Sequence, residues 1–140
     1  MKTMKTRNLA TLMFVLLSLS ISSCKDDEPT KDLTVTIVTE SVNHSEYIGN
    51  MAVTGARIYT RDNYKVTVEK IDNNTIKIVP EDSNATSFTV ALKEGSSGAI
   101  VSEDATLGVS FTENNGNMIL SYGYINNGST EAFSEGVKQN

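Results

Sequence analysis

The chain has 140 residues and a formal net charge of −5, with one cysteine, one histidine and no tryptophan. This length suits a single domain, and a lone cysteine excludes a disulfide within the chain, so that stability must come from a packed core. The acidic balance excludes nucleic acid as a partner, because nucleic-acid binding depends on cationic groups that displace counterions.

Residues 1–23 have the pattern of a secretory signal peptide. Three basic side chains within the first seven residues precede an apolar stretch from Leu9 to Ile21. This stretch is shorter than the roughly 20 apolar residues that a membrane-spanning helix needs, and it suits a signal sequence. Removal of the leader takes away three of the 12 basic residues and leaves nine against 17 acidic ones, a net charge of −8.

The leader ends on a motif with two small residues before a cysteine. The motif is Ile21-Ser22-Ser23-Cys24, and it resembles the bacterial lipobox. The resemblance implies that Cys24 takes a diacylglyceryl group and becomes the first mature residue, with the membrane as a partner through acyl chains. The alternative is an ordinary leader followed by a chance cysteine.

A polar, mostly acidic cluster follows the cysteine. It consists of Lys25, Asp26, Asp27 and Glu28. It resembles the surface-export signal of Bacteroidota lipoproteins, which implies a lipid-anchored location at the outer membrane with the protein exposed at the cell surface. The alternative is a solvated tether over residues 24–32, which Pro29 and the lack of apolar side chains also favour.

From Leu33 onward, apolar residues alternate with polar ones, which predicts half-buried β-strands and no helix. The alternating positions are Leu33, Val35 and Ile37; Tyr64, Val66 and Val68; Ile76 and Ile78; Phe88, Val90 and Leu92; Leu107, Val109 and Phe111; and Met118, Leu120, Tyr122 and Tyr124. Between these runs, Asn115-Gly116 predicts a type I′ hairpin, because both residues tolerate positive φ. The alternation breaks between Met51 and Tyr59, and Gly55 predicts a bulge there.

Eight or nine short strands, about ten residues apart, predict an all-β fold. We expect an antiparallel meander closed into a small barrel, with a β-sandwich as the alternative. The chain then divides into a signal peptide (1–23), a lipidated flexible tether (24–32) and a β-barrel domain (33–140).

Three runs of the chain resemble the calycin-like (lipocalin-like) domains of small Bacteroidota lipoproteins. They are Tyr47-Ile48-Gly49, Tyr64 to Ile78 and Glu131 to Lys138. The usual Gly-x-Trp signature is missing. The resemblance implies a calycin-like barrel whose interior is either filled by side chains or holds one small ligand. The candidates for that interior are Tyr64, Val66, Phe88, Phe111 and Tyr122.

The chain lacks the residue combinations that catalysis and metal binding usually need. His44 is the one histidine and lies in a polar stretch, and lipid occupies Cys24, so neither a nucleophilic triad nor a zinc site is expected. Two carboxylates in one cleft, as in a glycosidase, are the remaining enzymatic alternative. We expect no enzyme, no cofactor and no metal.

These features favour a non-enzymatic binding module at the outer membrane or cell surface, with a small apolar ligand or a protein as its target. The alternative is an inhibitor or accessory subunit that engages a partner protein through its loops and has no pocket. The barrel interior distinguishes them. An enclosed apolar void of about 300 Å³ or more favours the small ligand, and a filled interior favours the partner protein.

Overall fold

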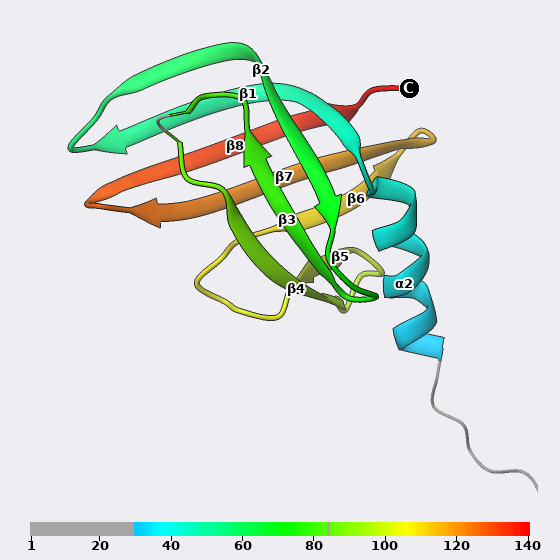
Figure 1. Ribbon diagram of the computed structural model, residues 1–140. Coiled ribbons are helices and arrows are strands. Elements are labelled where there is room, and N and C mark those ends of the chain that lie inside the picture. The colour runs from blue at the N-terminus through cyan, green and yellow to red at the C-terminus, as the bar shows by residue number, and fades with distance from the viewer. Residues whose placement is uncertain (1–29, 84) are drawn as a thin grey trace, which may run out of the picture.

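The computed structural model describes residues 30–83 and 85–140. In it, eight antiparallel strands form one closed ring, in which each strand pairs with its sequence neighbour and β8 returns to β1 (Figure 1). The strands are β1 (Ser45–Gly55), β2 (Tyr59–Lys70), β3 (Thr75–Pro80), β4 (Phe88–Glu94), β5 (Ile100–Ser102), β6 (Ser110–Asn114), β7 (Asn117–Asn126) and β8 (Ser129–Lys138). The predicted all-β antiparallel barrel is confirmed, and the sandwich alternative is wrong. The ring is uneven, since β2 has 12 residues and β5 has three.

Two Asn-Gly turns join the strands on either side of β7. Asn115 and Gly116 have φ of 51° and 79°, so the predicted type I′ turn between β6 and β7 is confirmed. Asn127 and Gly128 have φ of 48° and 76° and make a second turn of this kind between β7 and β8. The strand predicted from Leu107 starts later than expected, because β6 begins at Ser110.

The long strands bend at two bulges, and neither lies at Gly55. The register shifts place an extra residue on β8 near Glu135 and another on β2 near Asn63, and both of these residues have φ of 55°. The bulge predicted at Gly55 is therefore wrong. Gly55 ends β1 with φ of 104°, where an added Cβ would lie 2.3 Å from the carbonyl oxygen of Gly128.

The segment Thr30–Val42 is an α-helix, α2, so the strand predicted from Leu33 to Ile37 is wrong. Residues 30–32, which the sequence pattern assigns to the tether, belong to this helix, and the first strand begins at Ser45. Within the described residues, no helix is long and apolar enough to cross a membrane.

Tertiary packing explains why α2 is helical although it is rich in β-branched residues, which favour strands. One face of the helix packs against the barrel, next to β2 and β4. The side chains on this face recur at helical spacing: Val35, Val38, Thr39 and Val42. The burial of this face outweighs the weak intrinsic preference of the residues.

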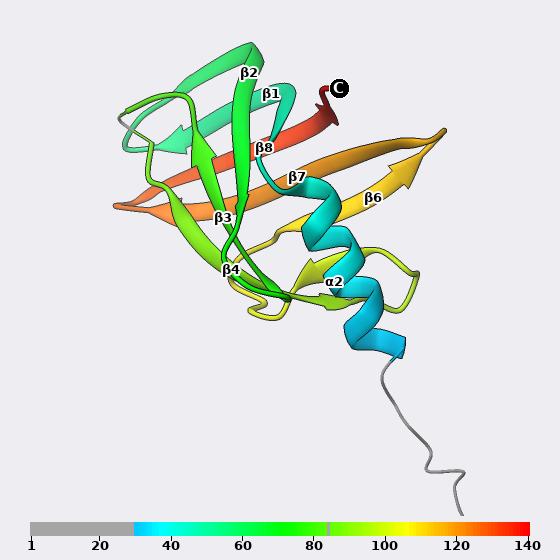
Figure 2. The ribbon, with the colours of Figure 1, turned by 45° about the vertical axis from the view of Figure 1, so that its right-hand side comes forward.

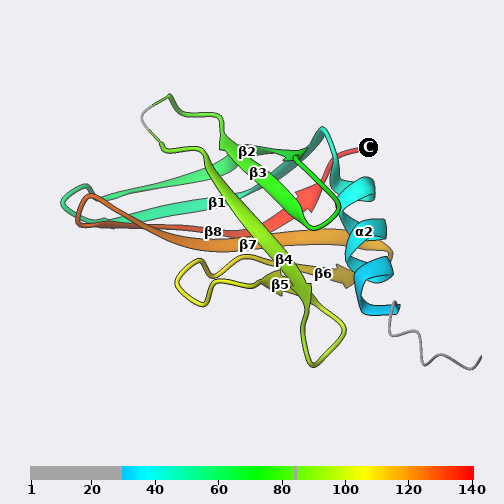
Figure 3. The same cartoon turned by 60° about the horizontal axis from the view of Figure 1, so that its bottom comes forward.

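The helix covers one end of the barrel, which we call the α2 end (Figure 2). The Thr39 hydroxyl donates to the carbonyl oxygen of Asn73 at 2.9 Å, and the Lys70 N–H donates to Oδ1 of Asn43 at 2.8 Å. The β1–β2 and β7–β8 turns project at the opposite end, together with the β3–β4 loop (Figure 3). We call this the hairpin end.

Large side chains fill the barrel. The largest of those less than 2% exposed are Tyr47, Tyr64, Phe111, Phe133, Met51, Ile76, Ile78, Leu92 and Leu120. Several rings touch: Tyr47 meets Phe111 at 6.0 Å between centroids, and Tyr122 stacks on Phe133 at 5.4 Å. The buried residues form one hydrophobic cluster that runs the length of the barrel.

Candidate functional site

At the hairpin end, neighbouring strands bring one row of side chains into register. Val53 on β1 pairs with Tyr59 on β2 and with Glu131 on β8, and Glu131 pairs with Tyr124 on β7. Burial alternates along β8, and Glu131 occupies a buried position of that alternation. The strand period therefore places a carboxylate on the inner face of the barrel.

Glu131 is 7% exposed, and the described residues give its carboxylate no hydrogen bond and no ion pair. Burial raises the pKa of the Glu131 carboxyl above its ordinary value. The guanidinium of Arg57 opposes this rise, and the carboxylate of Asp82 adds to it. A carboxylate in this setting is poorly stabilised in its charged form.

The hydroxyl of Tyr122 is buried without a hydrogen-bond partner among the described residues, and Glu131 is close enough to affect its pKa. Burial raises the pKa of Tyr122, and so do the nearby Tyr64, Glu131 and Tyr59. The pKa of Tyr59 is raised by burial and by the carboxylates of Asp82 and Glu131. Three phenol groups and a carboxylate thus share one region inside the hairpin end.

Aromatic rings surround this region. Phe88 stacks on Tyr124 with centroids 4.8 Å apart and a 7° angle between the ring planes, and it meets the edge of Tyr122 at 5.4 Å. We name Glu131, Tyr59, Tyr122, Tyr124 and Phe88 the rim cluster. It combines one negative charge, phenol hydroxyls and several ring faces.

One backbone hydrogen bond and one hydrogen bond from the backbone to a side chain join the two hairpin turns. The Ala56 N–H donates to the Gly128 carbonyl at 3.4 Å, and the Arg57 N–H donates to Oγ of Ser129 at 3.2 Å. This contact brings the charge of Arg57 close enough to affect Glu131.

The β3–β4 loop is fastened to the same end. The Asp82 N–H donates to the Tyr64 hydroxyl at 3.4 Å. Arg61 pairs with Glu81 at 3.6 Å and lies over the ring of Tyr64, 5.9 Å from its centroid. The cation of Arg61 is therefore already engaged at the rim.

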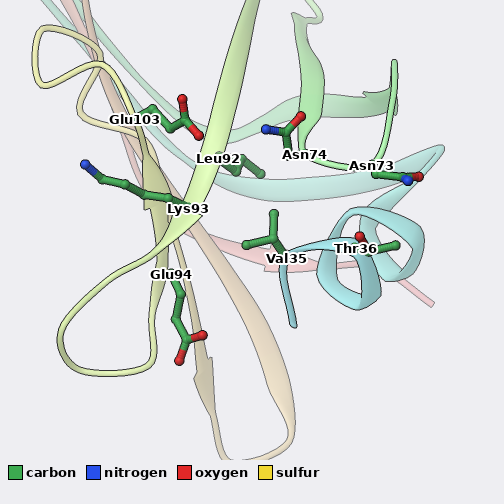
Figure 4. A pocket seen from close by; sticks show the side chains of 8 residues that line it. All are labelled: Val35, Thr36, Asn73, Asn74, Leu92, Lys93, Glu94 and Glu103. Atoms are coloured by element: carbon green, nitrogen blue, oxygen red, sulfur yellow. The ribbon is translucent and has the colours of Figure 1, made fainter. Parts of the chain in front are cut away.

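A groove of about 480 Å³ lies at the other end, between α2, the β2–β3 turn and β4 (Figure 4). Its lining residues are Val35, Thr36, Asn73, Asn74, Leu92, Lys93, Glu94 and Glu103. Most of these residues are polar, and the groove lies between α2 and the barrel. It is not the enclosed apolar void that a small apolar ligand requires.

No family model, curated protein or solved structure matches this chain. The calycin resemblance therefore stays a prediction, and the site rests on geometry and chemistry.

The sequence-predicted site residues fall into two groups. Ile21, Ser22, Ser23, Cys24, Lys25, Asp26, Asp27 and Glu28 lie outside the described residues. The five candidates for the barrel interior, Tyr64, Val66, Phe88, Phe111 and Tyr122, are each at most 9% exposed. Phe88 and Tyr122 belong to the rim cluster, and Tyr64 contacts Phe133 next to it, whereas Val66 and Phe111 lie beside Tyr47.

Glu131 is the site residue that the sequence analysis missed. Its position in the sequence could have indicated burial, because Glu131 lies two residues from both Ser129 and Phe133 on the same face of β8, and both of these residues are buried. A glutamate at an inward position of a barrel strand is unusual, because charged side chains are seldom fully buried without a partner.

The remaining chemical candidates are far less enclosed. His44 is exposed, with φ of 53°, in the turn between α2 and β1. The described residues contain no group of three His, Cys, Asp or Glu side chains that could hold a metal ion. The glycosidase alternative needs two inward-facing carboxylates, and Asp82, the carboxylate that affects the pKa of Glu131, lies in the β3–β4 loop.

Proposed function

We propose that the protein is a non-enzymatic binding module, anchored to the outer membrane through lipid on Cys24, that engages a partner protein through its hairpin end. The observation that carries the proposal is the filled interior of the barrel. Nine of its largest side chains, four of them aromatic, are less than 2% exposed. A core packed in this way favours contacts made by loops over an enclosed ligand.

The surface of the hairpin end supports the same proposal. Ile58, in the β1–β2 turn, is 82% exposed, and Ile125, close to the β7–β8 turn, is 71% exposed. Large apolar side chains on projecting turns are suited to burial against another protein. Six of the eight residues that line the groove beside α2 are polar, which gives the small apolar ligand less support.

The position of α2 fits the proposed anchor. Thr30, where the helix begins, is six residues after Cys24, and six extended residues reach about 20 Å. An anchor on Cys24 would keep the α2 end near the membrane. The hairpin end would then point away from it, toward a partner.

Purification of the lipidated protein from its native membranes, followed by mass spectrometry of co-purifying molecules, tests the partner. We expect a protein to co-purify with the wild type and to be lost with the double variant Ile58→Ser/Ile125→Ser. The matched control is Leu33→Ser/Ile37→Ser, since both side chains are 59% exposed on α2. Loss of the protein from the control variant alone, or recovery of an apolar small molecule instead of a protein, would contradict the proposal.

Two further measurements test the location. Cys24→Ala should abolish acyl labelling and release the protein from the membrane. Replacement of Asp26, Asp27 and Glu28 by alanine should protect the protein from protease added to intact cells. If protease access is unchanged, the surface-export signal is wrong, although the anchor can still hold.

A further inference from the structure

The rim cluster contains a buried charge that its surroundings do not neutralise. Glu131 is 7% exposed as a whole residue and has no hydrogen bond or ion pair among residues 30–83 and 85–140, but its carboxylate oxygens are not fully enclosed. Such a group is costly unless it takes up a proton or meets a cation. In the described part of the isolated chain, the Glu131 carboxylate therefore lacks a paired cation.

The aromatic rings around Glu131 indicate which kind of cation the site would bind. Tyr124 and Phe88 form a flat stack on one side, and Tyr59 lies on the other side, across Val53. Ring faces attract ammonium and guanidinium groups, particularly where water is excluded. Asp82 is close enough to affect Glu131, but the described residues bring no group of three His, Cys, Asp or Glu side chains together, which disfavours a metal ion.

The Tyr122 hydroxyl is a second polar group of the rim cluster without a hydrogen-bond partner among the described residues. The hydroxyl of Tyr122 is buried and can accept a hydrogen bond from an incoming N–H donor. Because this hydroxyl has almost no accessible surface, a cation that pairs with Glu131 can reach Tyr122 only if side chains of the rim cluster move apart.

Two cations in the described part of the chain, Arg57 and Arg61, act on the rim cluster, and neither forms an ion pair with Glu131. Arg61 is paired with Glu81 over the ring of Tyr64. Arg57 influences Glu131 from the β1–β2 turn, but its side chain is exposed and forms no ion pair among the described residues. We propose that the rim cluster binds a lysine or arginine side chain of the partner protein, with Glu131 as the counter-ion and Tyr59, Tyr122 and Tyr124 as the walls. The identity of the partner as a protein rests on the proposed function, whereas the chemistry of the site does not.

The test titrates N-acetyl-arginine amide and N-acetyl-lysine amide into the purified full-length protein, with the neutral N-acetyl-norleucine amide as the matched probe. NMR of the tyrosine rings follows binding. We expect saturable shifts of Tyr59, Tyr122 and Tyr124 with at least one cationic probe and affinity at least about tenfold weaker for the neutral probe. Equal binding of all three probes, or no binding of the cationic ones, would overturn the proposal.

Binding measurements on variants and at several pH values distinguish a specific site at Glu131 from nonspecific attraction of cations to an acidic protein. Glu131→Gln keeps the shape of the side chain and should weaken cation binding by about tenfold or more, whereas Glu113→Gln, on the exposed part of β6, should leave it unchanged. Arg57→Gln should strengthen binding a few-fold, by about 2- to 5-fold, because it removes a competing cation. If cationic probes bind only after Arg57 is replaced, Arg57 is the resident partner of Glu131 and the proposal is wrong.

Binding of the cationic probe can also be measured against pH on the wild-type protein, which tests the proposal even if Glu131→Gln does not fold. Binding of the cationic probe should weaken as acid protonates Glu131. Binding that is independent of pH down to the ordinary carboxyl range would count against Glu131 as the counter-ion. If the probes bind but no protein co-purifies, this site stands and the proposed function fails; if a protein is captured equally well by Glu131→Gln, the reverse holds.

Discussion

At the α2 end, Thr39 is fully buried and its hydroxyl donates to a carbonyl oxygen 2.9 Å away, whereas at the hairpin end Glu131 is almost as buried and has no such partner among the described residues. Tyr47 also has a buried hydroxyl without a partner, but burial alone raises its pKa. By contrast, the pKa of Tyr122 is raised by burial and also by a nearby carboxylate and two nearby phenols. The α2 end therefore serves as a structural closure, and the hairpin end holds unmet polar groups suited to recognition.

The largest test of this comparison is Val42→Asp, which buries a charge beneath α2. Val42 has no exposed surface, and an unpaired carboxylate there should lower the free energy of unfolding by about 3 kcal/mol or more. Urea denaturation measures the loss. Ile37→Asp, on the outer face of the same helix, should change it by no more than about 0.5 kcal/mol. Equal effects would mean that α2 does not close the barrel.

The next test breaks the contact between the two hairpin turns. Gly55→Ala forces a Cβ to within 2.3 Å of the Gly128 carbonyl oxygen at φ of 104°, and should cost about 2 kcal/mol. The control is Gly116→Ala, where φ is 79° but nothing lies within 4 Å; the backbone cost alone is about 1 kcal/mol. Thermal or urea unfolding compares the two. If the control is as damaging as Gly55→Ala, the contact between the turns is not the reason.

A pair of hydroxyl deletions sharpens the contrast between the ends. Thr39→Val removes a hydroxyl that donates to the Asn73 carbonyl and should lower the free energy of unfolding by about 1 kcal/mol. Tyr122→Phe removes a buried hydroxyl without a partner and should leave stability unchanged or raise it by up to about 1 kcal/mol. Opposite signs in calorimetry or urea denaturation support the comparison. A loss at Tyr122 equal to that at Thr39 would show that the Tyr122 hydroxyl has a partner.

The smallest expected effect is the pH dependence of stability due to Glu131. Burial raises the pKa of this carboxyl in the folded state above 4.5, so the folded state binds more protons than the unfolded state just above that pH. Stability attributable to Glu131 is therefore greatest in acid and falls as the pH rises through the raised pKa. Glu131→Gln should be the more stable form at neutral pH, by a few tenths to about 1 kcal/mol, and the difference should disappear in acid. Urea curves at several pH values check the trend, and a greater stability of the wild type at neutral pH would contradict it.

Some features of this fold are local in origin and could be predicted. The alternation from Tyr64 to Val68 and from Phe88 to Leu92 corresponds to strands β2 and β4, because period two places one face of a strand toward the core. The turn at Asn115-Gly116 follows from residues that accept positive φ. Consecutive hairpins of this kind lead to an antiparallel meander.

The features that were missed depend on contacts between distant segments. The stretch Thr34-Val35-Thr36-Ile37 has the local character of a strand, and it becomes helical because Val35 and Val42 are buried against the barrel. Gly55 marks a turn and no bulge, since its constraint comes from Gly128, a distant residue in the sequence. The bulges near Asn63 and Glu135 likewise appear only in the register between paired strands.

By itself, the sequence determined an all-β meander, its Asn-Gly turns and the identity of the residues able to form a core, because strand period and turn chemistry act over a few neighbouring residues. The tertiary structure alone decided that α2 closes one end and that Glu131 lies inside the other. The physical reason is that both depend on burial, which is set by the closure of β8 against β1 and by the docking of a helix on the finished barrel. The hairpin end, with its unpaired carboxylate among aromatic rings, is where the search for a partner should begin.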